Sequence, residues 1–223
     1  MVEIVAYRPE QRQALLDLSL RAWAPVFPLM EQDVPAFVYH SFYPEGWRQR
    51  QSSDLAEVLD GEPDGVDVEG ILRGIHRIST APDGEGPEVQ LLASGVGVPW
   101  IEEARRILAE DWGVRAATWS VTSWNELRRQ ALEVEKANFL APDSERQVPY
   151  VTQKLTGANG PFVATSDYDH LVPDQIRAWV PGDYYTLGAD GFGFSDTRAA
   201  ARRHYLIDAQ SVVVRALQAL VEQ

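Results

Sequence analysis

A glycine-containing turn at residues 94–100 is the first place in the sequence where the residue types permit chemistry. It reads Ser-Gly-Val-Gly-Val-Pro-Trp and joins a short apolar run to a helical pattern, and the free N–H groups at the start of a helix attract phosphate. However, Trp100 stands where the dinucleotide fingerprint Gly-x-Gly-x-x-Gly needs its third glycine, and the chain has no Gly-Lys-Ser or Gly-Lys-Thr phosphate loop. The glycines therefore indicate a tight turn and close packing of a helix on a sheet.

Ser195, Asp196 and His204 provide the three side-chain types of a hydrolase triad. The sequence around the serine does not match the nucleophile elbow Gly-x-Ser-x-Gly, since Ser195 is followed by Asp-Thr. We therefore expect Ser195 or Asp196 to cap the helix that carries residues 197–203.

The four histidines, at positions 40, 76, 170 and 204, are too scattered for a zinc signature of the His-Glu-x-x-His type. His170 ends the sequence Tyr-Asp-His and could supply a general base, but a surface or hydrogen-bonded structural role explains it more simply. The sequence thus predicts no catalytic residue and no metal-binding residue in this chain.

The composition excludes several classes of protein. The 223 residues include 33 acidic and 20 basic side chains, and the net charge of -13 disfavours nucleic acid and anionic lipid as partners. The densest basic cluster, Arg198, Arg202 and Arg203, is typical of a solvated helix face. The chain has no cysteine, so disulfides, thiolate nucleophiles and cysteine-based metal sites are ruled out. No apolar run is long enough to cross a membrane, and residues 1–8 lack the order of a secretion signal, so we expect a cytoplasmic protein.

The first 60 residues favour helices. Residues 3–7 alternate like a short strand, and the helical patterns that follow lie at 10–23, 34–43 and 46–59. The next stretch, 61–69, is rich in acidic residues, glycine and proline and cannot bury apolar area, which is typical of a linker. We therefore expect three parts, which are a helical segment 1–60, an acidic linker 61–69 and a domain 70–223.

Strands and helices alternate in the rest of the chain. The predicted strands lie at 89–94, 114–121, 162–165 and 184–187. Pro99 suits the first turn of a helix that Gly113 ends, and Ser123 with Glu126 forms a capping box for a helix that runs to about Phe139. A last amphipathic helix begins at residue 208 or 209. This alternation favours a largely parallel sheet that is covered by helices on both faces.

Open parallel sheets bind ligands beyond the carboxyl ends of their strands. A groove at that edge is therefore where a small molecule would bind to this domain. The residues predicted to line it are Gly95, Val96, Gly97, Thr122, Ser123, Ser166 and Asp167.

Several stretches carry a family resemblance. They are Gly-Ile-Leu-Arg-Gly-Ile at 70–75, Val-Gln-Leu-Leu-Ala-Ser-Gly at 89–95, Asp-Trp-Gly-Val at 111–114, Trp-Ser-Val-Thr-Ser-Trp-Asn-Glu-Leu at 119–127, Val-Pro-Tyr-Val-Thr at 148–152 and Gly-Ala-Asp-Gly-Phe-Gly-Phe-Ser-Asp-Thr-Arg at 188–198. Together they resemble the C-terminal domain of the homodimeric pyruvate dehydrogenase first component, the thiamine-dependent decarboxylase of the transketolase superfamily. The resemblance covers about residues 63–223.

This resemblance implies a three-layer α/β/α domain with a mixed, mostly parallel five-stranded sheet, preceded here by a mainly helical segment. In the full-length family, thiamine diphosphate and Mg²⁺ are bound by the two preceding domains, so no cofactor-binding residue is carried over to this chain. Ala189-Asp190-Gly191 looks like the start of the metal-holding motif, but no asparagine follows Asn159 to complete it. The implied role is structural, with self-association or pairing with other pyruvate dehydrogenase chains.

Residues 1–60 resemble the opening strand and helices of a GNAT-type N-acetyltransferase. The stretches that carry this resemblance are Tyr-Arg-Pro-Glu at 7–10, Leu-Leu-Asp-Leu-Ser-Leu-Arg-Ala-Trp-Ala-Pro-Val-Phe at 15–27 and Tyr-Pro-Glu-Gly-Trp at 43–47. That family binds the pyrophosphate of acetyl-CoA with a glycine-containing loop, whose nearest counterpart here, residues 153–160, has the wrong spacing. Two alternatives to a structural role stay open. One is an acetyl-CoA-dependent N-acetyltransferase, and the other is a small-ligand-binding α/β module.

The aromatic residues of the second part allow two interpretations. Large rings are usually buried in the core, but rings left exposed would form an apolar patch that favours self-association. The residues in question are Trp100, Trp119, Trp124, Trp179, Tyr184 and Tyr185.

Overall fold

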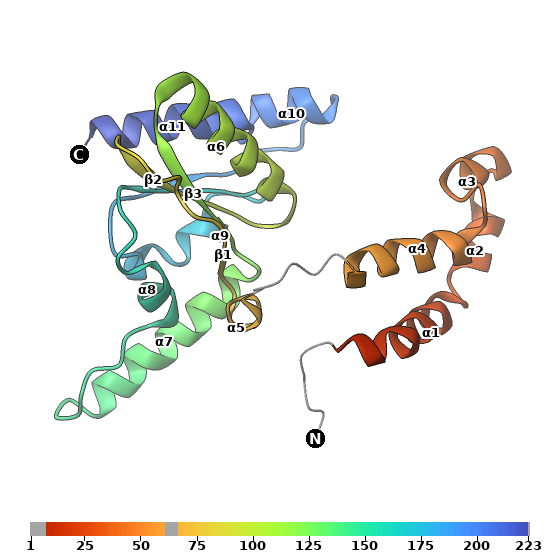
Figure 1. The fold of residues 1–223 in the computed structure, drawn as a ribbon, viewed down its shortest axis with the longest axis horizontal. Coiled ribbons are helices and arrows are strands. Elements are labelled where there is room, and N and C mark those ends of the chain that lie inside the picture. Colours follow the sequence, from red (N-terminus) through yellow and green to blue (C-terminus); the bar gives the residue numbers. More distant parts are fainter. Residues whose placement is uncertain (1–7, 61–66, 223) are drawn as a thin grey trace. The chain divides into compact units, whose positions relative to one another are not determined.

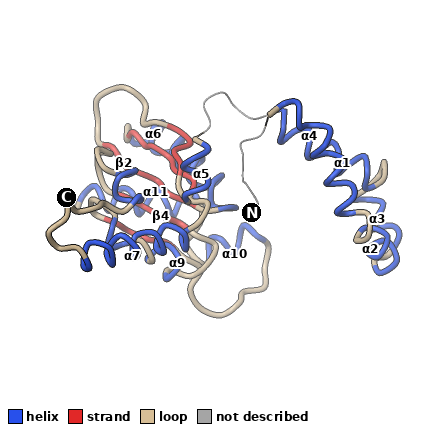
Figure 2. The backbone as a smooth tube through the Cα atoms, turned by 90° about the horizontal axis from the view of Figure 1, so that it is seen from below, coloured by secondary structure: helices blue, strands red, loops and turns tan. Residues whose placement is uncertain are grey.

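The computed structural model of the chain describes residues 8–60 and 67–222, and it divides into two compact units, Met1–Val66 and Asp67–Gln223. In the parts described, the first unit contains only helices and loops, and all strands belong to the second (Figures 1 and 2). Each unit is considered by itself.

The first unit consists of short helices around an aromatic cluster. Its elements are the 3-10 helix η1 (Pro9–Gln11) and the α-helices α1 (Arg12–Trp23), α2 (Phe27–Asp33), α3 (Ala36–Phe42) and α4 (Trp47–Asp60). Phe27 is buried and stacks on Trp47, with ring centroids 4.6 Å apart, while Tyr43 meets it edge-on at 5.3 Å. The three predicted helices are confirmed, and the predicted strand 3–7 lies outside the described residues. The sequence did not predict α2, whose Pro28 lies in the first turn, where proline is tolerated.

The second unit is built on a five-stranded sheet. Its strands are β1 (His76–Ser79), β2 (Glu88–Ala93), β3 (Arg115–Ser120), β4 (Phe162–Thr165) and β5 (Tyr184–Leu187), in the order β1-β3-β2-β4-β5. β1 is antiparallel to β3, and the other neighbours are parallel. The mixed, mostly parallel sheet is therefore confirmed.

Helices cover both faces of this sheet. The longer ones are α6 (Val98–Trp112) and α11 (Ala209–Val221) on one face, and α7 (Trp124–Leu140) with α8 (Tyr150–Leu155) on the other (Figure 1). Leu91 and Leu92 are neighbours in β2 and both are fully buried, the first in the α6–α11 cluster and the second in the α7–α8 cluster. A strand that is buried on both faces explains why this run lacks apolar–polar alternation.

The remaining short elements complete the second unit. They are α5 (Val68–Arg73), η2 (Gly95–Gly97), α9 (Leu171–Asp174), η3 (Arg177–Trp179) and α10 (Arg198–His204). Because α5 begins at Val68 and the side chain of Asp67 caps it by accepting from Gly70 N–H, residues 67–69 do not form the linker expected over 61–69. Residues 61–66 lie outside the described residues.

Local signals set the ends of the long helices. Gly113 ends α6 in the left-handed region (φ +62°), and Ser123 Oγ accepts a hydrogen bond from Glu126 N–H at the start of α7 (3.1 Å). The predicted cap of α10 is wrong. Thr197, rather than Ser195 or Asp196, accepts the hydrogen bond from Ala200 N–H, because the Asp196 carboxylate already bonds Thr197 N–H.

The aromatic residues prove to be mostly core. Trp119, Trp124, Tyr184 and Trp100 are each at most 8% exposed, and the other two are partly buried. The interpretation of these rings as an exposed association surface is therefore wrong for these four. The exposed large apolar side chains of the second unit are different residues.

Candidate functional site

Four parallel strands end together at one edge of the sheet. Ala93, the last residue of β2, is paired with Ser120 in β3 and with Thr165 in β4, and Thr165 is paired with Leu187 in β5. The loops that follow these strands must therefore begin side by side. The predicted groove residues lie on the first three of these loops, after β2, β3 and β4.

The loop after β2 lies close to β4. A Cβ atom at Gly97 would lie 3.2 Å from the Cβ of Ala93 and 3.6 Å from Cγ2 of Thr165, which leaves little room for a side chain. Gly95 has a φ of +48°, a conformation that glycine adopts without strain. Both glycines thus serve the tight turn that the sequence indicated, and they bring Val96 to the surface at the carboxyl edge.

The polar groups after β3 are already used within the fold. Thr122 Oγ1 donates to the carbonyl of Ile71 (2.7 Å), and Ser123 N–H donates to the carbonyl of Gly74 (3.2 Å). Ser123 Oγ is the cap of α7. These bonds tie the residues after β3 to α5 and to Gly74, which follows it, so Thr122 and Ser123 position backbone.

The residues after β4 are mixed in character. Ser166 is fully buried, its Oγ accepts from Tyr168 N–H (3.1 Å), and its N–H donates to the carbonyl of Leu187 (3.0 Å). The buried hydroxyl of Thr165 has no hydrogen-bond partner among the described residues. Asp167 is exposed. The structure thus places the predicted groove residues at one sheet edge, and ligand binding there stays a prediction.

His170 and Asp190 form a polar link at this edge. The backbone N–H of His170 donates to Asp190 Oδ1 (2.9 Å), the ring Nδ1 lies next to Asp190 Oδ2, and the ring Nε2 lies 3.0 Å from the carbonyl oxygen of Thr186. The hydrogen bond from the backbone of His170 and the nearby imidazole hold the pKa of Asp190 below its ordinary value. Gly188 permits this contact, since a Cβ there would lie 2.4 Å from His170 N. The sequence did not reveal the pair because twenty residues separate its members.

The suggested hydrolase triad does not form. The ring of His204 stacks on Phe194 with centroids 4.2 Å apart, and Asp196 bonds the neighbouring backbone. Across the described residues, no hydrogen bond joins Ser195, Asp196 and His204.

The residues present do not fit a thiamine diphosphate–metal site. Residues 8–60 and 67–222 contain no cluster of three or more His, Asp or Glu side chains that could hold a metal ion. Both carboxylate oxygens of Asp190, the residue that looks like the first metal ligand of the family motif, are taken up by His170.

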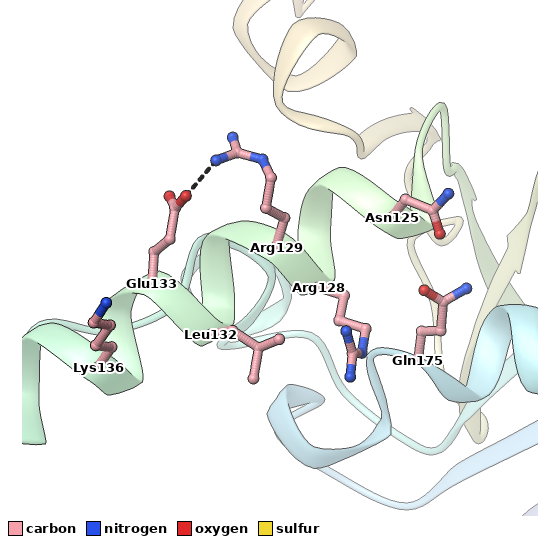
Figure 3. Close-up of a pocket in the computed structure, with 7 residues that line it drawn as sticks. All are labelled: Asn125, Arg128, Arg129, Leu132, Glu133, Lys136 and Gln175. Carbon is pink, nitrogen blue, oxygen red and sulfur yellow. Dashed lines mark hydrogen bonds and ion pairs between the residues drawn. The ribbon is translucent and has the colours of Figure 1, made fainter.

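A hollow of about 420 Å³ lies between α7 and the segment after α9 (Figure 3). It is lined by Asn125, Arg128, Arg129, Leu132, Glu133, Lys136 and Gln175. Arg129 forms ion pairs with Glu126 and Glu133, both at 2.5 Å, and these contacts neutralise its charge. The exposed i,i+3 and i,i+4 pairs are typical of a solvated helix face, so this hollow has no evident chemistry.

Comparisons with known protein sequences identify the family of this chain. Residues 74–208 match the family model described as transketolase-like TK C-terminal domain. The pyruvate dehydrogenase E1 component of Mycolicibacterium smegmatis is 47% identical over 184 residues, covering 82% of this chain and 19% of that protein. The corresponding Mycobacterium tuberculosis protein is 52% identical over 159 residues, covering 71% and 17%. A solved transketolase from Pichia stipitis has a TM-score of 0.49 at 16% identity, covering 72% of this chain and 20% of its own.

The chain spans about a fifth of the length of these curated relatives. The family match begins at residue 74, so the acetyltransferase resemblance of residues 1–60 stays a prediction. Among the helices of the described residues, none has the length and apolarity needed to span a membrane. With a family match over more than half of its residues, this chain belongs to the transketolase-like C-terminal domain family and is homologous to the C-terminal region of the pyruvate dehydrogenase E1 component.

Proposed function

We propose that this chain is an assembly domain of a pyruvate dehydrogenase-type first component and that it does not decarboxylate pyruvate by itself. The observation that carries this proposal is a set of four large, exposed side chains that follow the carboxyl ends of three neighbouring strands. One lies in η2 after β2, two lie after β4, in the loop and in α9, and one lies in the loop after β5. They are Val96 (55% exposed), Tyr168 (65%), Leu171 (73%) and Phe192 (98%).

The loops that carry these side chains are joined to one another. Ala189 N–H donates to the carbonyl of Tyr168 (2.8 Å), and His170 holds Asp190, so the loops after β4 and β5 present their apolar residues from one ordered edge. Full burial of one such side chain contributes about 1.5–3 kcal/mol, and an apolar patch of this kind on a soluble domain marks an interaction site. We infer that a second copy or another chain of the same enzyme class covers it.

The cofactors are part of this proposal. Because the described residues do not fit a thiamine diphosphate–metal site, thiamine diphosphate and Mg²⁺ would be bound by other domains. When bound there, the cofactor supplies the decarboxylation chemistry. This chain would contribute packing and loop positions.

The direct test is to add thiamine diphosphate, Mg²⁺ and pyruvate to the purified chain and to measure carbon dioxide release. We expect no release above background. In a second measurement, light scattering after size exclusion should show self-association, or a complex with a first-component fragment that lacks its last fifth. Decarboxylation by the isolated chain would refute the non-catalytic role, and a strict monomer that binds no such fragment would refute the assembly role.

Phe192→Ser provides the site-specific arm of this test, with Phe139→Ser as its matched control. Phe139 is also highly exposed (82%), but it lies near the end of α7 rather than at the carboxyl edge. Association should weaken at least tenfold with Phe192→Ser and remain unchanged with Phe139→Ser. Equal effects of the two changes would indicate non-specific apolar association.

The two alternative functions are tested separately. An N-acetyltransferase in residues 1–60 requires acetyl-CoA binding, so a thermal-shift experiment with acetyl-CoA should raise the melting temperature if that function exists. A ligand site in the carboxyl-edge groove should appear as chemical-shift changes at Gly95 and Gly97. We regard the assembly role as better supported, because most polar side chains of the predicted groove bond within the fold.

A further inference from the structure

A second, more polar hollow lies at the opposite edge of the sheet. Its volume is about 360 Å³, and it is lined by residues of β1, the segment 80–83, β2, β3 and the segment 154–159. Because β2 and β3 run parallel, their amino ends meet here, at the edge remote from the groove described above. No pattern in the sequence predicted a site at this edge.

The floor of this hollow is a fixed polar network. Gln90 is only 1% exposed, and its amide nitrogen donates to the carbonyl of Asn159 (2.9 Å) and to Glu88 Oε1 (3.1 Å). Its amide oxygen accepts from Trp119 Nε1 (2.9 Å). Since the buried amide bonds in both directions, the floor is preorganised and a ligand would not have to rearrange it.

Two of the three cations in the hollow are neutralised. Arg115 lies 3.1 Å from Glu88 and also donates to the carbonyl of Pro82 (3.1 Å), which holds the rim in place. Lys154 forms an ion pair with Asp67, and this contact together with the hydrogen bond from Gly70 lowers the pKa of Asp67. Because Arg115 and Lys154 are each paired with a carboxylate, neither is available to form a strong ion pair with a ligand.

Two charges of opposite sign remain. The guanidinium of Arg77 lies 5.3 Å from the ring centroid of Trp119 and has no hydrogen-bond or ion-pair partner in the described parts of the chain. The carboxylate of Asp83 likewise has none there. Both residues line the same hollow. A guanidinium recognises a carboxylate through its fork of N–H donors, and a carboxylate recognises an ammonium group.

We propose that this hollow binds a small free α-amino acid as its zwitterion, with the α-carboxylate on Arg77 and the α-ammonium on Asp83. The carboxylate of Asp83 would repel an anion, and the guanidinium of Arg77 would repel a simple amine, so only a ligand with both charges satisfies both free groups. The other lining residues include the small or neutral Thr80, Gly157 and Ala158, which suit a ligand with a small polar or short side chain. This proposal does not depend on the proposed assembly function.

Isothermal titration of the full chain tests the proposal, with glycine, L-alanine and L-serine as zwitterions and acetate, methylammonium and inorganic phosphate as probes whose charge is of one sign only. At least one amino acid should bind with a dissociation constant of about 1 mM or tighter. Each probe with charge of one sign should bind at least tenfold more weakly. Phosphate or acetate binding as tightly as the amino acid, or no saturable binding of any amino acid, would overturn the proposal.

Variants locate the site. Arg77→Ala and Asp83→Asn should each weaken amino-acid binding at least tenfold, and Arg77→Lys should restore part of it, because lysine keeps the charge but not the fork. Arg198→Ala, which removes an equal charge from exposed α10, should have no effect. In NMR spectra, the indole N–H resonance of Trp119 should shift on binding. Binding that survives both Arg77→Ala and Asp83→Asn, or that leaves the Trp119 resonance unmoved, would place the ligand elsewhere.

Discussion

His170 lies between the carboxylate of Asp190 and the carbonyl oxygen of Thr186. β5 is the last strand of the sheet, so the carbonyls on its outer side have no neighbouring strand. Two of these carbonyl oxygens form hydrogen bonds with side chains. Arg177 Nη1 donates to Tyr184 O (2.5 Å), and His170 Nε2 lies 3.0 Å from Thr186 O. These contacts protect an edge that would otherwise be free to pair with another strand.

Asp190→Asn should destabilise the second unit at neutral pH but not in acid. The pKa of Asp190 is lowered in the fold, so its carboxylate stabilises the folded state above the ordinary carboxyl pKa of about 4. That contribution is lost as the pH falls through the lowered value. Urea unfolding should therefore show a gap in stability between wild type and variant at pH 7 that closes in strong acid, once the pH has fallen through the lowered pKa of Asp190.

The control for this experiment is Asp167→Asn, because Asp167 is exposed and has no ion pair among the described residues. Its stability should follow the wild type at both pH values. A gap between Asp190→Asn and wild type that persists unchanged in strong acid would show that the carboxylate charge is not responsible.

Gly160→Ala should be among the most damaging single changes in the chain. A Cβ at this position would lie 1.7 Å from the carbonyl oxygen of Glu88, and the backbone φ is +77°. Backbone would have to move, so we expect a loss of more than ~3 kcal/mol in the free energy of unfolding. Chemical denaturation followed by circular dichroism measures this loss.

Gly157→Ala is the matched control for the change at Gly160. Its φ is +83°, but nothing lies within 4 Å of the added Cβ. Only the cost of the left-handed backbone remains, about 1 kcal/mol. If the two alanine variants were equally stable, the close approach of this loop to β2 would not be present in solution.

Ser123→Ala should remove the N-cap of α7 at a cost of about 1 kcal/mol, because Glu126 N–H loses its acceptor. The comparison is Ser144→Ala, whose exposed side chain has no hydrogen bond in the described structure. Thermal unfolding should distinguish the two variants by a few degrees. Indistinguishable melting temperatures would mean that the cap contributes nothing measurable.

Leu108→Ala should cost about 2–5 kcal/mol, because Leu108 is fully buried in the α6–α11 cluster and the substitution leaves a cavity. Leu132→Ala removes the same atoms from a side chain on α7 that is 39% exposed, so a clearly smaller loss is expected. Urea denaturation of both variants checks the difference. A Leu108→Ala variant as stable as Leu132→Ala would contradict the arrangement of the two layers.

Sequence patterns predicted the elements whose signals are local. Gly113 and Ser123 set helix ends through a left-handed φ and a side-chain acceptor, which involve only neighbouring residues. The apolar run at β2 predicted a doubly buried strand. The same reasoning misplaced the cap of α10, since Ser195, Asp196 and Thr197 are all good caps and only the chain path decides which one accepts from the helix.

β1 escaped prediction for a different reason. His76–Ser79 is short and half-exposed, and it has no strand pattern of its own. It becomes a strand because β3 offers hydrogen bonds along its free side. The predicted groove residues lie at a common edge because parallel strands end together. The sequence did not reveal that the side chains of Thr122, Ser123 and Ser166 form hydrogen bonds with the backbone.

The sequence alone thus determined the alternation of strands and helices in the second unit, its family resemblance and several helix ends, because these depend on residues close together in the chain. Tertiary structure alone decided which distant groups meet. Asp190 reaches His170 across twenty residues, and Arg77 and Asp83 share a hollow with residues of β3 and of the loop after α8. These contacts between distant residues depend on strand order and register. Because order and register arise from the packing of the whole sheet, they cannot be predicted from the sequence of any single segment.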